Sequence, residues 1–113
     1  MLLDAPIRNF SEDCIARGID ILVQVLPNER LRIDWIENRS GEKGLGRKVI
    51  EELFDLADDN DCDVELSVLM GEPRLCAYYM SMGFEYEGED EENCPVYCRR
   101  AHTPVASAAM APA

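Results

Sequence analysis

Apolar and polar residues alternate in two early segments, as they do in strands that are buried on one face. Residues 19–26 are rich in β-branched and apolar side chains, and in residues 31–37 the apolar Leu31, Ile33 and Trp35 occupy every second position. The Pro-Asn-Glu-Arg sequence between the two segments is typical of a turn. The pattern therefore predicts two strands that pair as an antiparallel hairpin.

The hydrophobic period then changes to that of a helix over residues 44–59. Residues 64–69 alternate again, which predicts a third strand. A strand, a helix and a strand over residues 31–69 form a βαβ unit, whose two strands should be parallel with a right-handed crossover. The helix face expected to be buried consists of Leu45, Val49, Leu53, Leu56 and Ala57.

The first 18 residues are harder to interpret. Residues 1–10 fit either a short strand or an irregular segment, and Ser11 is a typical N-cap for a short helix that ends at Gly18. At the other end of the chain, residues 101–113 are rich in Ala and Pro and predict a flexible tail. We therefore expect one domain over residues 1–100.

After the third strand, Pro73 predicts the first turn of a second long helix, which should run to Met82 and stop at Gly83. Residues 84–87 and 95–100 then predict two further strands, joined by an acidic turn. These last two strands should form a second hairpin.

Composition narrows the possible functions. The 113 residues carry a formal net charge of −12, which argues against nucleic-acid binding across a broad face. Five cysteines without paired spacing, no long apolar run and no signal-peptide pattern predict a reduced, cytoplasmic protein with no membrane span. We expect no metal site; Cys94, Cys98 and His102 form the alternative set of ligands.

A basic segment interrupts this acidic chain between residues 39 and 48. The segment contains four cationic side chains and one carboxylate, which gives a net charge of +3, and it has glycines at positions 41, 44 and 46. The segment joins a predicted strand to the start of a predicted helix. A glycine turn lets the backbone approach an anion, and a helix N-terminus offers unpaired N–H groups, so the segment predicts a phosphate site.

Two motifs resemble those of the GCN5-related N-acetyltransferase (GNAT) superfamily over residues 19–100. The first is Gly44-Leu45-Gly46-Arg47, which opens a helix after a strand ending in Trp35-Ile36-Glu37. The second is Tyr78-Tyr79-Met80-Ser81-Met82-Gly83-Phe84, which is similar to the Leu-Tyr-x-x-x-Gly-Phe ending of the family. The resemblance implies an α/β fold with a mixed, mostly antiparallel sheet, a central βαβ unit and helices on both faces.

The resemblance also implies an activity, the transfer of an acetyl group from acetyl-CoA to a primary amine of a protein or a small cationic molecule. Tyr79 occupies the position of the tyrosine that protonates the leaving thiolate, and either Asp34 or Glu37 would help to deprotonate the amine. The acidic stretch of residues 87–92 would favour a cationic amine. The expected cofactor-binding residues are Ile36, Arg39, Gly41, Lys43, Gly44, Leu45, Gly46 and Arg47.

Three departures from the family pattern support an alternative function. Gly41 stands where the family usually has Arg or Gln, Glu72 stands where Asn is frequent, and residues 1–18 replace a longer N-terminal region. The alternative is a non-catalytic GNAT-fold protein that works by binding, such as a phage virion component or a modulator of a host factor. A third possibility is an acidic decoy for a nucleic-acid-binding protein. Exposed strand edges make a homodimer or another protein partner plausible.

Overall fold

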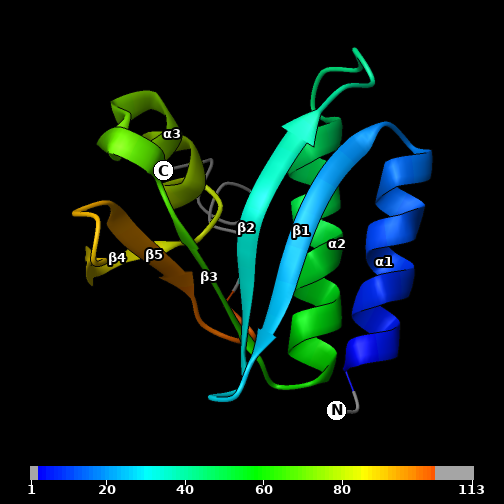
Figure 1. Cartoon of the computed structure of the whole chain (residues 1–113), viewed down its shortest axis with the longest axis horizontal. Coiled ribbons are helices and arrows are strands. Elements are labelled where there is room, and N and C mark those ends of the chain that lie inside the picture. Colours follow the sequence, from blue (N-terminus) through cyan, green and yellow to red (C-terminus); the bar gives the residue numbers. More distant parts are fainter. Residues whose placement is uncertain (1–2, 104–113) are drawn as a thin grey trace, which may run out of the picture.

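The computed structural model describes residues 3–103, which form a mixed five-stranded sheet and three α-helices (Figure 1). Residues 104–113 lie outside the described part, so the flexible tail over residues 101–113 stays a prediction. The elements in chain order are α1 (Asp4–Ala16), β1 (Ile19–Leu26), β2 (Arg30–Asn38), α2 (Leu45–Asp59), β3 (Asp63–Ser67), the 3-10 turn η1 (Leu69–Gly71), α3 (Pro73–Met80), β4 (Glu85–Glu89) and β5 (Pro95–Arg99).

The sheet has the strand order β1-β2-β3-β5-β4. β1 pairs with β2 and β4 pairs with β5 in antiparallel fashion, which confirms both predicted hairpins. β2 and β3 are parallel and are joined through α2, which confirms the βαβ unit. β5 then inserts between β3 and β4, antiparallel to both.

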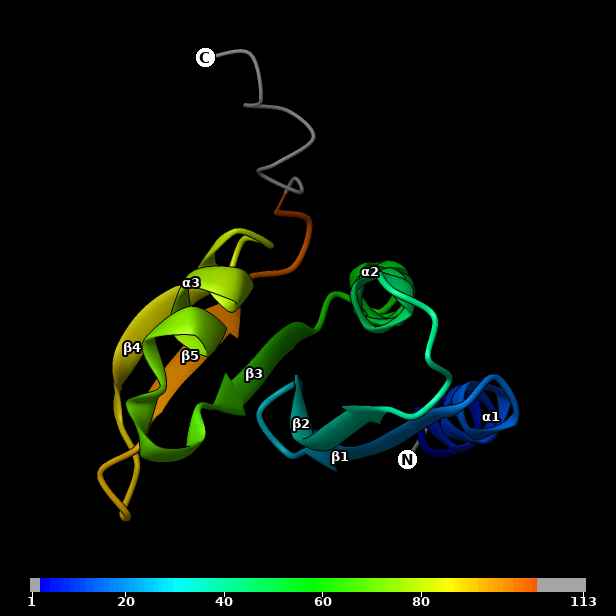
Figure 2. The same ribbon diagram turned by 90° about the horizontal axis from the view of Figure 1, so that it is seen from above.

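The first helix begins much earlier than the sequence predicts. α1 starts at Asp4, so Ser11 is an interior residue of the helix and not its N-cap. The cause is tertiary packing: Leu3, Ile7 and Cys14 recur at helical spacing and all three are buried in the core. Figures 1 and 2 show α1 running beside β1, so that the helix flanks this edge strand of the sheet.

All three helices contribute side chains to one core. α2 covers β2 and β3 from one side (Figure 2), and Phe84, just after α3, packs against Phe54 of α2 with the ring centroids 5.5 Å apart. The helix face also differs from the prediction, because Ile50 and Phe54 are buried while Leu56 is only half-buried. The buried residues of α2 are Leu45, Val49, Ile50, Leu53, Phe54 and Ala57.

A β-bulge at Asp34 changes which residues of β2 face the core. Leu22 of β1 pairs with Trp35, yet the next β1 residue, Val23, pairs with Ile33, so Asp34 is the extra residue. Past the bulge Ile36 packs against the core, while Trp35 turns to the opposite face and is 53% exposed. The prediction that Trp35 shares a face with Leu31 and Ile33 is therefore wrong.

The face of the sheet opposite α2 carries an ion-pair network. Arg30 Nη1 lies 3.1 Å from a carboxylate oxygen of Glu65 and 2.9 Å from one of Glu87, and Arg32 lies 2.7 Å from Glu65. The hydrogen bond from Arg30 lowers the pKa of Glu87 below its ordinary value. Glu87 is thus paired on the sheet, although the sequence grouped it with the acidic residues expected near a substrate.

Candidate functional site

β2 and β3 separate at their carboxyl ends and leave a groove. Their pairing stops at Ile33 and Leu66, after which β2 continues to Asn38. Among the described strands, β1 alone pairs with this last part of β2. Its other backbone edge therefore offers N–H and C=O groups to an extended ligand. The groove between the separated strands has a volume of about 290 Å³.

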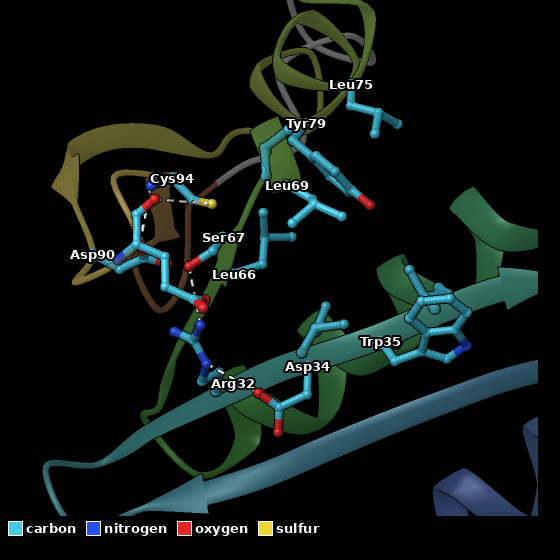
Figure 3. Close-up of a pocket in the computed structure, with 14 residues that line it drawn as sticks. Arg32, Asp34, Trp35, Leu66, Ser67, Leu69, Leu75, Tyr79, Asp90 and Cys94 are labelled. Atoms are coloured by element: carbon cyan, nitrogen blue, oxygen red, sulfur yellow. Dashed lines mark hydrogen bonds and ion pairs between the residues drawn. The ribbon is translucent and has the colours of Figure 1, made fainter. Parts of the chain in front are cut away.

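Figure 3 shows that the walls of the groove come from several elements. Ile33, Ile36, Leu66 and Val68 contribute apolar surface, and Asp34 and Trp35 come from the outer part of β2. α3 contributes Leu75 and Tyr79, and the β4–β5 turn contributes Asp90, Glu92 and Cys94. The lining thus combines a largely apolar interior with carboxylates at the rim.

Tyr79 is held rigidly with its hydroxyl directed into the groove (Figure 3). The residue is only 9% exposed, and its ring packs edge-on against Phe84 at 5.6 Å and Tyr78 at 5.2 Å. Within residues 3–103 the structure records no hydrogen bond from this hydroxyl. Burial, with a smaller effect from Tyr78, raises the pKa of Tyr79 above its ordinary value, so the phenol stays protonated at neutral pH.

The two carboxylates that the sequence could not separate lie in different places. Asp34 lines the groove together with Tyr79, and the Arg32 Nε donates to its Oδ1 at 3.0 Å. Glu37 does not line the groove; it is exposed and lies 3.3 Å from Arg39. Of the two candidate carboxylates, Asp34 therefore lies in the groove with Tyr79, and Glu37 does not. Ile36, which we expected at the cofactor, also lines the groove.

The glycine turn lies at the end of β2 and leads into α2. Gly41 and Gly44 have φ angles of 79° and 84°, in the left-handed region that glycine adopts without strain. Side chains brace the turn: Asn38 Oδ1 accepts the Ser40 N–H at 3.0 Å, and Ser40 Oγ accepts the Glu42 N–H at 2.9 Å. Our sequence analysis missed Asn38 and Ser40, although Asn and Ser at such positions are typical turn residues.

The turn leaves its backbone accessible to an anion. A Cβ placed on Gly41, Gly44 or Gly46 would meet no atom within 4 Å, so open space lies in front of each glycine. The first N–H groups of α2 have no carbonyl partner within the helix. Leu45 is buried, so only its backbone could serve a cofactor, while the Lys43 side chain is exposed. The expected phosphate site is thus geometrically open.

The two arginines predicted for this site already have partners. Arg39 Nε lies 2.8 Å from Asp20, and its side chain is mostly exposed. Arg47 lies 3.5 Å from Glu51 and donates to Ser81 Oγ at 3.3 Å, which links α2 to the end of α3. Both could reorient toward a phosphate, because these contacts are at the surface and contribute little individually.

The described residues do not assemble the alternative metal ligands. Over residues 3–103, no three His, Cys, Asp or Glu side chains converge in a way that could hold a metal ion. His102 instead lies 2.8 Å from Asp61, and both Cys94 and Cys98 are buried free thiols. None of the helices in this part of the chain is both long and apolar enough to cross a bilayer.

Comparison with known proteins identifies the fold. No protein-family model matches the sequence, and no curated protein is significantly similar to it. Among solved structures, the ribosomal-protein-S18-alanine N-acetyltransferase of Escherichia coli is similar with a TM-score of 0.63 and 17% identity, over 77% of this chain and 63% of that one. The PaiA N-acetyltransferase of Thermoplasma acidophilum, solved with coenzyme A, has a TM-score of 0.59 and 14% identity, over 71% and 51%.

A third similar structure is of comparable size. The anti-CRISPR protein AcrVA5 has a TM-score of 0.54 and 21% identity, and the match covers 70% of this chain and 88% of that one. By contrast, the chain spans less than two thirds of the length of the two acetyltransferases. The strand order, the splayed parallel pair and these similarities agree: the chain has the fold of the GCN5-related N-acetyltransferases.

Proposed function

We propose that the protein transfers an acetyl group from acetyl-CoA to a primary amine. The observation that carries the proposal is the groove where β2 leaves β3, because it combines three features needed for this reaction. It has a free backbone edge on β2, a protonated tyrosine hydroxyl in its wall and a basic glycine turn at the end of the same strand.

The cofactor would lie along β2 and end at the start of α2. The pyrophosphate would accept hydrogen bonds from the backbone between Lys43 and Arg47, with positive charge supplied by Lys43, Arg47 and Arg39. The pantetheine arm would pair with the free edge of β2 near Ile36. The PaiA structure, which contains coenzyme A, supports use of this cofactor by the fold.

In the proposed reaction the amine nitrogen attacks the thioester carbonyl, the C–S bond breaks and an amide forms. Asp34 takes the proton of the amine, directly or through water, and Tyr79 donates a hydrogen bond to the departing sulfur. A thiol has a pKa of about 8.5 and an ordinary tyrosine one of about 10, so complete proton transfer from a buried tyrosine would be uphill. Tyr79 therefore stabilises the thiolate mainly as a hydrogen-bond donor.

Acetyl-CoA binding to the Gly46→Glu variant, measured by isothermal titration calorimetry, tests the cofactor site. Gly46 lies in the first turn of α2, and an added side chain meets nothing nearby, so the variant should fold. The glutamate would obstruct and repel the pyrophosphate, and we expect affinity to fall by about tenfold or more. Gly46→Gln is the matched control for size without charge, and it should lose less. Wild-type protein that fails to bind millimolar acetyl-CoA would overturn the proposal.

A non-catalytic binding role is the second candidate. Glu72 caps α3 by accepting the Leu75 N–H at 2.8 Å, where the family often has an asparagine. The similarity to the anti-CRISPR protein AcrVA5, which covers 88% of that chain, supports a protein of this size that has the fold and is not a full-length acetyltransferase. Acetyl-CoA binding without release of free CoA in the presence of any amine would favour this function. A cytoplasmic location, a phage origin and a homodimer stay predictions from the sequence.

A further inference from the structure

A second hollow of about 420 Å³ adjoins the groove, and we call it the outer hollow. η1 and the β4–β5 turn form its walls, and it shares Leu69, Glu92 and Cys94 with the groove. We propose that the outer hollow binds residues next to the acetylated amine, so that the acceptor is a polypeptide segment with an apolar side chain and a positive charge. This inference rests on the proposed acetyl transfer and specifies its acceptor.

The shared walls make the outer hollow a continuation of the reaction site. Tyr79 lies in the groove, and the shared Leu69, Glu92 and Cys94 lead from there to the surface formed by Met70 and Glu89. A small amine would need only the groove. An acceptor that continues beyond its amine would extend along the outer hollow, which is how peptide ligands place successive side chains in neighbouring pockets.

Apolar side chains of the outer hollow are exposed to an unusual degree. Leu69 is 73% exposed and Met70 is 89% exposed, although both are large hydrophobic residues. Met70 also has a φ of 57°, a left-handed conformation that is uncommon for residues other than Gly, Asn or Asp. The chain thus places a flexible apolar side chain where the local backbone favours glycine. Methionines at a surface are well suited to packing against varied partner side chains.

The charge of the outer hollow is negative and uncompensated. Its two acidic residues are Glu89 and Glu92, and within residues 3–103 neither forms an ion pair. In contrast, Glu65 and Glu87 on the open face of the sheet are both paired with Arg30. A cationic ligand would therefore gain attraction in the outer hollow without competing against an existing partner. Together with Leu69 and Met70, this favours an apolar and basic peptide.

Met70→Gly is the most informative variant. It removes the exposed side chain and relieves the positive φ, so it should not unfold the protein. Met80→Ala is the matched control, because Met80 is also an exposed methionine but lines neither the groove nor the outer hollow. Neither methionine belongs to the proposed catalytic or cofactor-binding residues.

The probes are two N-terminally fluorescein-labelled, C-terminally amidated peptides, Gly-Leu-Lys-Leu-Arg and Gly-Ser-Lys-Ser-Glu. Binding is followed by fluorescence anisotropy, and acetylation of the unlabelled N-acetyl forms and of spermidine is followed by release of free CoA. We expect the Leu/Arg peptide to bind about tenfold or more tightly than the Ser/Glu peptide, and Met70→Gly to weaken it about fivefold or more. In turnover, Met70→Gly should raise KM for this peptide but not for acetyl-CoA, and Met80→Ala should change neither.

Three results would overturn the inference: equal binding of both peptides, an unchanged Kd in Met70→Gly, or preferential acetylation of spermidine. Failure of the proposed acetyl transfer would give a different set of results from failure of this inference. In that case calorimetry detects no acetyl-CoA binding, while the anisotropy measurement still reports whether the outer hollow discriminates between the peptides.

Discussion

Replacing Tyr79 with phenylalanine separates the catalytic role of this residue from its structural role. The ring is buried between Tyr78 and Phe84, whereas the hydroxyl faces the groove and has no hydrogen-bond partner within residues 3–103. Tyr79→Phe therefore retains the packing and removes no hydrogen bond from the folded protein. We expect its free energy of unfolding, measured in urea, to stay within about 0.5 kcal/mol of the wild-type value.

The effect on catalysis should be much larger. In the transition state the Tyr79 hydroxyl would donate to a sulfur that carries developing negative charge. A hydrogen bond to a charged group contributes about 1.5–3 kcal/mol, which corresponds to a loss of roughly 10- to 150-fold in kcat. KM for acetyl-CoA should change little, because the uncharged thioester sulfur of the ground state is a weak acceptor.

Release of free CoA under saturating acetyl-CoA, with the N-acetylated Leu/Arg peptide or spermidine as the acceptor, measures this loss. Tyr78→Phe is the matched control, because Tyr78 is the neighbouring half-buried tyrosine on α3 and does not line the groove. It should retain wild-type kcat. If Tyr79→Phe turns over as fast as the wild type, the assignment of Tyr79 to the leaving group is refuted, since the packing argument predicts no compensating change.

Two further predictions concern ion pairs that join the end of α2 and the turn after it to the end of β5 and the residues that follow. Asp58→Ala should lower the free energy of unfolding in urea by about 3–5 kcal/mol, because Arg99 would lose its carboxylate partner; its side chain is 3% exposed and packs 4.1 Å above the Phe54 ring. The double variant Asp58→Leu with Arg99→Met should recover most of this loss of stability. A loss under about 1 kcal/mol in Asp58→Ala would contradict the argument. The hydrogen bond to Asp61 raises the pKa of His102, so the stabilisation from protonated His102 is complete below the unfolded pKa of about 6.5 and disappears as pH rises through the folded pKa. His102→Asn should therefore lower Tm at pH 5.5 and leave it unchanged at pH 8.5; an equal effect at both pH values would show that charge is not involved.

The interior of the fold was predictable from the sequence because local signals agree with one another there. The β1 segment is rich in apolar and β-branched residues, and the structure has the strand at the predicted residues 19–26. The glycine turn and the amphipathic helix after it specify where α2 begins, and a single crossover helix between two strands is typical of a parallel pair. Tyr79 was identified by the motif that ends α3, and the structure places its hydroxyl in the groove.

Other features depended on contacts between distant residues. The start of α1 at Asp4 follows from the burial of Leu3 and Ile7 in a core built by later elements, which no N-terminal capping signal reveals. The side of the sheet taken by Trp35 depends on the bulge at Asp34, and a strict period of two cannot show that one residue is inserted.

By itself, then, the sequence determined the order of the elements, the parallel pair and the glycine turn, because each depends on neighbouring residues along the chain. Only the tertiary structure decided which acidic residues are available for chemistry. Glu37 and Glu87 lie outside the groove, whereas Asp34, which is paired with Arg32, and Glu92 line it. The physical reason is that the groove is built by strands, a helix and a turn that lie far apart in the sequence, so their packing decides which carboxylates line it.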